Sequence, residues 1–170
     1  MIFVTVGAQM PFDRLIQAVD RWAGRTGRDD VFAQIGRSDY RPRHIRWEAF
    51  LDEAAFTQQV KRARALVAHA GIGSIFAALQ HGKPIVVMPR RAALGETRNE
   101  HQSATARYFR EMGIAVAADE HELPALLDKL DTLTCGVRIG PDASPRLIET
   151  LRNFIEGAAP SRARVEVPET

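Results

Sequence analysis

Short apolar runs alternate with segments of helical periodicity along most of this chain. The runs are rich in β-branched residues, several close on glycine or are bracketed by prolines, and they predict strands buried on both faces. They cover residues 2–6, 31–36, 65–68, 84–89 and 114–117. A further run, residues 45–50, alternates apolar and polar positions as a half-exposed strand does.

Helices are expected between these strands. The first begins near Phe12 and is ended by Gly24 and Gly27. The others are expected at residues 52–63, 75–81, 102–112, 119–130 (a charged surface helix) and 145–155. Strands that alternate with helices predict an α/β fold, a Rossmann-like, doubly wound and mostly parallel sheet that binds ligands at the carboxyl ends of its strands. Residues 1–157 are expected to form one domain and residues 158–170 a flexible tail.

Composition narrows the class of protein. The 170 residues are 45% hydrophobic and 26% charged, as in a soluble globular domain. The net charge of +2 and the scattered arginines give no dense basic face, so nucleic acid is not an expected partner. The single cysteine, Cys135, excludes an internal disulfide and cannot build a metal site alone. The chain opens on a strand without an export signal and has no apolar run of about 20 residues, so a cytoplasmic location is expected.

The stretch with the clearest chemical potential is His-Ala-Gly-Ile-Gly-Ser at residues 69–74, between a strand and a helix. Gly71 and Gly73 are expected to adopt backbone angles closed to other residues and to let a ligand approach the main chain. Ser74 is placed to cap the helix or to bind a phosphate oxygen. His69 is placed to donate a hydrogen bond to the same anion. Free N–H groups of the first helical turn would complete an anion site.

The alternative interpretation is an ordinary strand-to-helix turn, whose glycines serve packing and whose histidine is a satisfied polar residue. The dinucleotide fingerprint G-x-G-x-x-G is not met, because Phe76 occupies the third glycine position. A Walker A loop is absent too, because no Gly-Lys-Ser/Thr follows. A phosphate bound here would therefore belong to neither of those families.

Three motifs in order resemble a known family. They are residues 3–7 followed by 12–16, residues 69–74, and residues 82–87 leading to 99–102. Together they resemble the donor-binding, C-terminal half of GT-B glycosyltransferases. The resemblance is to small separate subunits, similar to the catalytic subunit of the dolichol-linked N-acetylglucosaminyltransferase and to bacterial exopolysaccharide glycosyltransferase subunits. It covers residues 1 to about 130.

The resemblance implies a site for a UDP-sugar donor. It places the diphosphate on the 69–74 loop and the sugar or ribose near the Asn-x-His-Gln segment. The implied diphosphate contacts are Gly7, His69, Gly71, Gly73 and Ser74, and the implied sugar or ribose contacts are Asn99, Glu100, His101 and Gln102. An alternative for the second group is a helix start with Asn99 as its cap. Many relatives carry a glutamate three residues after the loop serine, where this chain has Ala77, so ribose must be held in another way.

The implied reaction transfers a sugar from UDP to a lipid-linked acceptor in polysaccharide or glycolipid biosynthesis. His69 would stabilise the departing phosphates and Asp13 is a candidate base, with no cofactor or metal expected. A GT-B enzyme needs two lobes, so the acceptor lobe is expected on a membrane-anchored partner subunit, which would hold this chain at the cytosolic face of the membrane. The apolar face of residues 145–155 is a candidate docking surface, although packing on its own sheet is the other use.

Two further functions remain open. The chain can be a non-catalytic nucleotide-sugar-binding or regulatory subunit, which the alanine at position 77 favours, or a nucleotide-sugar epimerase-like lobe. The arginines of one loop and the following strand are either a solvated face or a contact for acidic lipid or the acceptor diphosphate. They are Arg37, Arg41, Arg43 and Arg46.

Overall fold

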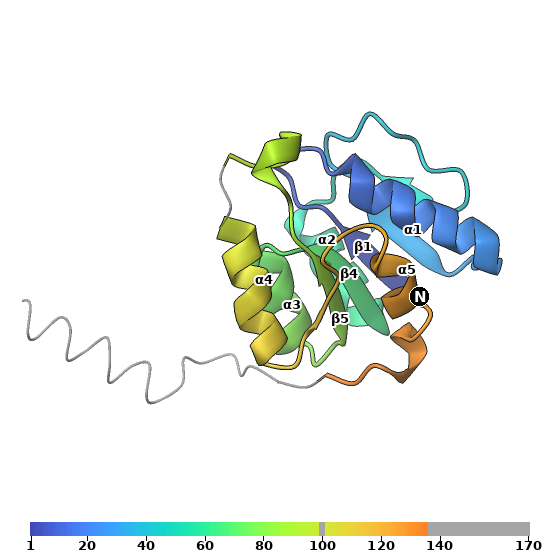
Figure 1. The fold of residues 1–170 in the computed structure, drawn as a ribbon. Coiled ribbons are helices and arrows are strands. Elements are labelled where there is room, and N and C mark those ends of the chain that lie inside the picture. Colours follow the sequence, from blue (N-terminus) through green and yellow to red (C-terminus); the bar gives the residue numbers. More distant parts are fainter. Residues whose placement is uncertain (99–100, 136–170) are drawn as a thin grey trace, which may run out of the picture. The chain divides into compact units, whose positions relative to one another are not determined.

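A parallel sheet of six strands organises the residues that the computed structural model describes, 1–98 and 101–135. The strand order is β3-β2-β1-β4-β5-β6, and every neighbouring pair is parallel. The strands are β1 (Ile2–Thr5), β2 (Val31–Gln34), β3 (Arg46–Glu48), β4 (Ala65–His69), β5 (Ile85–Met88) and β6 (Ala115–Val116). Figure 1 shows the sheet with its helices, and the expected doubly wound α/β class is confirmed.

The helices connect these strands in alternation. They are α1 (Asp13–Thr26), α2 (Glu53–Arg62), α3 (Ile72–Gln80), α4 (His101–Glu111) and α5 (Leu123–Leu127), with 3-10 turns η1 (Ala92–Leu94) and η2 (Leu130–Thr132). Capping interactions determine where some of these helices begin or end. The Asp52 carboxylate accepts a hydrogen bond from the Ala55 amide at 2.7 Å and caps α2. Gly27, with φ of 67°, ends α1 in the left-handed conformation that favours glycine.

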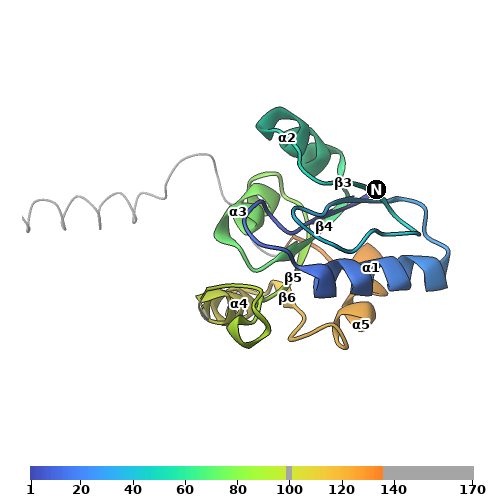
Figure 2. The same ribbon diagram turned by 90° about the horizontal axis from the view of Figure 1, so that it is seen from above.

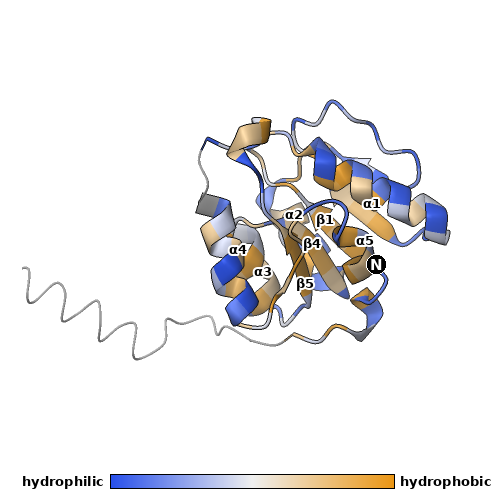
Figure 3. Ribbon diagram, viewed as in Figure 1, coloured by the Kyte–Doolittle hydropathy of each residue, from blue (hydrophilic) through white to orange (hydrophobic). Residues whose placement is uncertain are grey.

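The core has two layers, one on each face of the sheet. Alternate residues of β1 point to opposite faces, so Ile2 and Val4 pack with α1 and α5 while Phe3 packs with α2, α3 and α4. Figure 2 shows α1 and α5 on one side of the sheet and α2 and α3 on the other. In Figure 3 the central strands are mainly hydrophobic, as expected for strands covered on both faces.

The register brings the carboxyl ends of four strands to one edge. Thr5 at the end of β1 pairs with Gln34 of β2 and with Ala68 of β4. His69, the last residue of β4, pairs with Met88 of β5. The order reverses between β1 and β4, and a doubly wound sheet offers its ligand crevice at such a switch point.

Three expectations about helices were wrong. The surface helix at residues 119–130 is instead the short helix α5 and a 3-10 turn, whose Leu123, Leu127 and Leu130 are buried in the core. Helix α1 runs through Gly24, where a Cβ would meet the His44 ring at 2.7 Å, so this glycine serves packing. Helix α3 begins at Ile72 rather than at residue 75.

The C-terminal expectations fall on residues that the structure does not describe. The helix at 145–155, the boundary at 157 and the tail at 158–170 all lie beyond residue 135. Within the described ranges, no helix combines the length and apolar character needed to cross a membrane.

Candidate functional site

A cleft of about 630 Å³ lies at the carboxyl ends of β1, β2, β4 and β5. Many of its lining residues come from the turn after β1, from the β4–α3 turn and from residues 90–102. The cleft brings together six residues that the sequence singled out. They are Gly7, His69, Gly71, Gly73, Ser74 and Gln102. The predicted anion loop and part of the predicted sugar segment therefore face the same space.

The N-terminus of α3 supplies the strongest anion-binding feature of the cleft. Gly71 is the N-cap, and the first helical hydrogen bond runs from the Ile75 amide to the Gly71 carbonyl at 3.2 Å. The amides of residues 72–74 have no partner within the described chain. These N–H groups, with about half a positive charge from the helix dipole, are a ready site for a phosphate.

Ser74 is the third residue of α3 and not its cap, which corrects one of its two predicted roles. The side chain is buried, lines the cleft, and makes no hydrogen bond to the rest of the described chain. A hydroxyl in the first turn of a helix, next to unbonded amides, is therefore left for a ligand.

The two loop glycines differ in what they do, and only Gly71 serves packing, as the alternative interpretation expected. Neither Gly71 nor Gly73 has positive φ, whereas Gly7 does, with φ of 71°. A Cβ on Gly71 would lie 2.2 Å from His69 Nε2, and a Cβ on Gly7 would lie 2.9 Å from His69 Cε1. Gly7 and Gly71 thus make room for the imidazole ring, while a Cβ on Gly73 would enter open space.

Gly71→Ala is expected to displace the His69 ring and to weaken anion binding by about tenfold, the cost of roughly one hydrogen bond. Thr57→Ala on α2 is the control, because the Thr57 side chain does not line the cleft. Titration with UDP and urea denaturation of both variants measure the difference. Equal UDP affinity in the two variants would contradict the packing role of Gly71.

His69 is largely buried and neutral at pH 7. Burial and the nearby Arg90 charge lower its pKa to about 4, and an interaction with the Thr5 backbone opposes this shift. Its Nδ1 atom is buried without a hydrogen-bond partner in the described chain. A neutral imidazole carries one N–H donor, so His69 is suited to donate to an anion without contributing a full charge.

The stability of the chain is expected to depend on pH through His69. Its folded pKa of about 4 lies below the ordinary value of 6.5, so between these values the unfolded chain binds more protons. The free energy of unfolding should therefore fall by about 3 kcal/mol as the pH is lowered from 6.5 to 4. Urea denaturation at several pH values tests this, and His69→Gln should flatten the profile in that window. A variant that keeps the wild-type slope would contradict the assignment.

Arg90 is the main site residue that the sequence did not reveal. Arg90 is 3% exposed, and its guanidinium donates to the carbonyls of Val6 at 2.6 Å, Met10 at 2.7 Å and Pro11 at 3.0 Å. It also donates to the Glu96 carbonyl at 2.8 Å. Arg90 thereby ties the turn after β1 to the segment after β5, two walls of the cleft. Nothing in the sequence separates it from its neighbour Arg91, because both follow the same strand.

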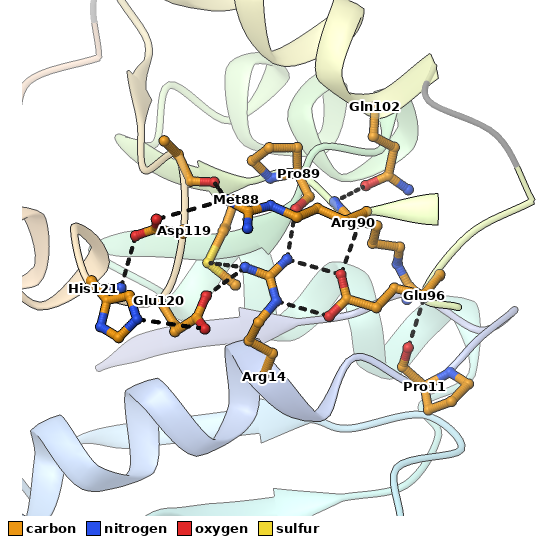
Figure 4. A network of polar contacts seen from close by, with 12 residues as sticks. Pro11, Arg14, Met88, Pro89, Arg90, Glu96, Gln102, Asp119, Glu120 and His121 are labelled. Atoms are coloured by element: carbon orange, nitrogen blue, oxygen red, sulfur yellow. Dashed lines mark hydrogen bonds and ion pairs between the residues drawn. The ribbon is translucent and has the colours of Figure 1, made fainter. Parts of the chain in front are cut away.

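Glu96 lines the cleft but is fully engaged (Figure 4). Its two oxygens accept from Arg14 Nε and Nη2, both at 2.8 Å, and from the Arg91 amide at 2.9 Å. Arg14 also pairs with Glu120 at 2.7 Å, and its pKa is raised, chiefly by the hydrogen bond to Glu96. The pair therefore holds the wall of the cleft, and Glu96 is not a free base.

Two of the three glutamines that line the cleft have their amide oxygen bonded within the chain. The Gln102 oxygen accepts from the Arg90 amide at 3.2 Å, so its NH₂ group is the part left for a ligand. The Gln34 oxygen accepts from the Thr5 hydroxyl at 3.1 Å, which leaves its NH₂ group in the same way. Gln34 was not predicted, although its place at the end of β2 is a position where ligands bind in such sheets.

Of the remaining predicted site residues, the structure describes the side chain of Asp13 alone. Asp13 is not among the lining residues of the cleft, and its carboxylate accepts a hydrogen bond from the Ser38 hydroxyl. Asn99 and Glu100 lie outside the described residues, as does the side chain of His101. In the described ranges no group of His, Cys, Asp or Glu is arranged to hold a metal ion.

Comparison with known proteins connects this geometry to a family. The model of the glycosyltransferase family 28 C-terminal domain matches residues 1–134. The human UDP-N-acetylglucosamine transferase subunit ALG13 is 30% identical over 122 residues, which are 66% of this chain and 10% of that protein. The mouse protein of the same name is 31% identical over 121 residues, 65% of this chain and 10% of that one. This chain thus spans about a tenth of the length of these relatives.

Solved structures share the fold. An NMR structure of ALG13 has a TM-score of 0.57 at 21% identity and covers 88% of this chain and 93% of that chain. MurG of Acinetobacter baumannii has a TM-score of 0.61 at 16% identity, over 91% of this chain and 49% of that chain. The kitacinnamycin glycosyltransferase has a TM-score of 0.57 at 19% identity, and the match covers 91% of this chain and 38% of that chain. The architecture is that of one GT-B lobe, and by the match over residues 1–134 this chain belongs to the family of glycosyltransferase family 28 C-terminal domains.

Proposed function

We propose that this chain is the donor-binding subunit of a glycosyltransferase and that it holds a UDP-sugar in the cleft above β1 and β4. The observation that carries the proposal is the convergence of the free α3 amides, Ser74 and His69 on one space. The name of the human and mouse relatives, a UDP-N-acetylglucosamine transferase subunit, supports UDP as the nucleotide. Residues 1–157 would form the donor-binding domain.

In this proposal the diphosphate lies against the N-terminus of α3. Gly7 and Gly71 leave room for the His69 ring, and Gly73 leaves the helix start uncovered for the ligand. The Gln102 NH₂ group donates to a sugar hydroxyl, because its oxygen is already bonded to Arg90. Asn99, Glu100 and His101 remain predicted contacts for the sugar or ribose.

The chemistry required of the site is stabilisation of the leaving group. Negative charge grows on the UDP phosphates as the bond to the sugar breaks, and donors fixed in advance stabilise that charge most effectively. The α3 amides, the Ser74 hydroxyl and the neutral His69 N–H are such donors. A proton held at His69 is not needed for this role, since its pKa of about 4 keeps it neutral at pH 7.

The acceptor side is proposed to come from elsewhere. We infer a lipid-linked sugar as acceptor, in polysaccharide or glycolipid biosynthesis, and a second, membrane-anchored subunit that carries the acceptor lobe and brings this chain to the cytosolic face of the membrane. The name of the relatives, which calls them subunits, supports a partner. So does the fold match, which covers 49% of MurG and 38% of the kitacinnamycin enzyme.

A second function is favoured because the described carboxylates near the cleft are already bonded to other residues. Glu96 is engaged by Arg14, Asp13 is engaged by Ser38 and does not line the cleft, and the alanine at position 77 offers no carboxylate. A chain without a free base in its described cleft can serve as a non-catalytic nucleotide-sugar-binding subunit. Turnover by the assembled complex that survives every cleft substitution would favour this alternative.

Binding of UDP and of UDP-sugars tests the proposal. Ser74→Ala and His69→Ala should each weaken UDP binding by about 10-fold to 100-fold, the loss of one hydrogen bond to a charged group. Gln102→Ala should weaken the binding of UDP-N-acetylglucosamine or another UDP-sugar more than the binding of UDP itself. Thr57→Ala, which removes a hydroxyl on α2 outside this cleft, is the control. Unchanged UDP affinity in both anion-site variants, with an intact fold, would show that the diphosphate assignment is wrong.

A further inference from the structure

A second hollow adjoins the donor cleft. It has a volume of about 560 Å³ and shares with the cleft the turn residues Ala8, Gln9 and Met10 and the opposite residue Thr97. Its remaining lining residues are Arg37, which follows β2, and Arg98. The two spaces therefore lie on either side of the same short turn.

The hollow carries positive charge that none of the described residues pairs with. Arg37 and Arg98 are exposed, and neither side chain makes a hydrogen bond or ion pair with the described residues. No carboxylate is among the lining residues that the structure describes. Of the described acidic residues nearest to these arginines in the sequence, Asp39 does not line the hollow and Glu96 is engaged by Arg14.

The backbone around the hollow is fixed by the same contacts that shape the cleft. Arg90 donates to the carbonyls of Met10 at 2.7 Å and Glu96 at 2.8 Å, and so joins the turn after β1 to the segment that carries Thr97 and Arg98. Gly36, with φ of 59°, packs so closely on this turn that a Cβ would lie 3.0 Å from the Gly7 carbonyl. Arg37 therefore follows a residue that is anchored on the shared turn.

We propose that this hollow is a second phosphate subsite, and that it takes the phosphate or diphosphate group of the sugar acceptor. The inference rests on the proposed function for the identity of the ligand. Guanidinium groups match phosphate oxygens in charge and in bidentate geometry. The donor diphosphate at α3 and the acceptor phosphate at Arg37 and Arg98 would then lie on opposite sides of residues 8–10, with the acceptor held beside the sugar that it receives.

The first test is nuclear magnetic resonance on the chain saturated with UDP, titrated with inorganic pyrophosphate. The Nε–H signals of Arg37 and Arg98 should shift along one saturable curve. The double variant Arg37→Gln/Arg98→Gln should bind pyrophosphate at least about tenfold more weakly, as expected for the loss of charged hydrogen bonds. The control Arg25→Gln/Arg62→Gln removes the same charge from the last turns of α1 and α2 and should leave the curve unchanged.

The outcomes separate this inference from the proposed function. If the UDP-saturated chain binds no pyrophosphate, or if the double variant binds it like the control, the second subsite is wrong. If UDP fails to shift the α3 amides while pyrophosphate still shifts Arg37 and Arg98, the donor proposal fails and the phosphate subsite stands.

A vesicle experiment distinguishes two sources of the phosphate. Phosphatidylcholine vesicles that contain a polyprenyl diphosphate should recruit the UDP-loaded chain, and the double variant should lose this recruitment, if the acceptor is lipid-borne. Pyrophosphate binding without recruitment assigns the subsite to a soluble phosphorylated acceptor. Vesicles that contain phosphatidylglycerol as their only anionic lipid test for general charge attraction. If they recruit the chain equally well, and if the control variant loses recruitment as much as the double variant does, the subsite is wrong.

Discussion

Arg90→Met is expected to lower the free energy of unfolding by about 3–5 kcal/mol, since it leaves buried carbonyl groups without their shared donor. The guanidinium of Arg90 serves the carbonyls of Val6, Met10, Pro11 and Glu96, and no other donor to these four groups is found in the described chain. The guanidinium also lies 5.0 Å from the centre of the Phe12 ring, a contact that methionine replaces only in part. Urea denaturation measures the loss.

The neighbouring arginine is a matched control for this substitution. Arg91 is 42% exposed, donates to the Ala118 carbonyl at 3.2 Å and pairs with Asp119 at 3.7 Å. Arg91→Met should cost less than about 1 kcal/mol, as exposed pairs do. If the two substitutions cost the same, Arg90 does not hold the walls of the cleft together.

Arg90→Lys separates charge from geometry. A lysine keeps the charge but offers a compact group of three donors in place of the planar guanidinium fork. Relative to Arg90→Met, the lysine variant should recover part of the free energy of unfolding but little of the UDP affinity. The reason is that lysine would not keep the turn after β1 at its native distance from residues 90–98. UDP affinity restored to the wild-type value in Arg90→Lys would show that charge alone suffices.

The sequence predicted the sheet well because its signals are local. Apolar runs such as those of β1, β4 and β5 are buried on both faces, and their alternation with helices defines a parallel order. Asp52 before α2 and Gly27 after α1 carry chemistry that fixes helix ends wherever it occurs. The anion loop was found for the same reason, since strand, glycine and helix start are adjacent in the chain.

The errors and omissions arise where packing over long range decides. Leu123, Leu127 and Leu130 lie among charged residues, so the segment was taken for a surface helix, but these leucines fill the core beside α1. Gly71 was expected to serve either backbone freedom or packing, and it makes room for a histidine ring two residues away, a contact that the local pattern does not specify. The ion pair of Arg14 and Glu96 joins positions that are 82 residues apart, and no local sequence pattern predicts it.

Assembly with the proposed acceptor-lobe subunit is expected to raise sugar transfer by at least about a hundredfold over the isolated chain, which corresponds to roughly 3 kcal/mol of transition-state stabilisation. The described residues form one GT-B lobe, and their cleft is bounded by that lobe alone. Phosphate contacts in an open cleft are weakened by the high dielectric of water. The isolated chain should therefore fold and bind UDP weakly, with almost no transfer to a lipid-linked acceptor.

Closure by a second lobe would exclude water and complete the acceptor site, so the same α3 amides, Ser74 and His69 would act on the leaving phosphates in a lower dielectric. Transfer to a polyprenyl-diphosphate sugar, measured with the chain, the partner and both together, tests this. Ser74→Ala in the assembled enzyme is the control, because it should reduce the transfer gained on assembly without preventing assembly itself. Rapid acceptor-dependent transfer by the isolated monomer would contradict the partner proposal and would place the whole acceptor site on this chain.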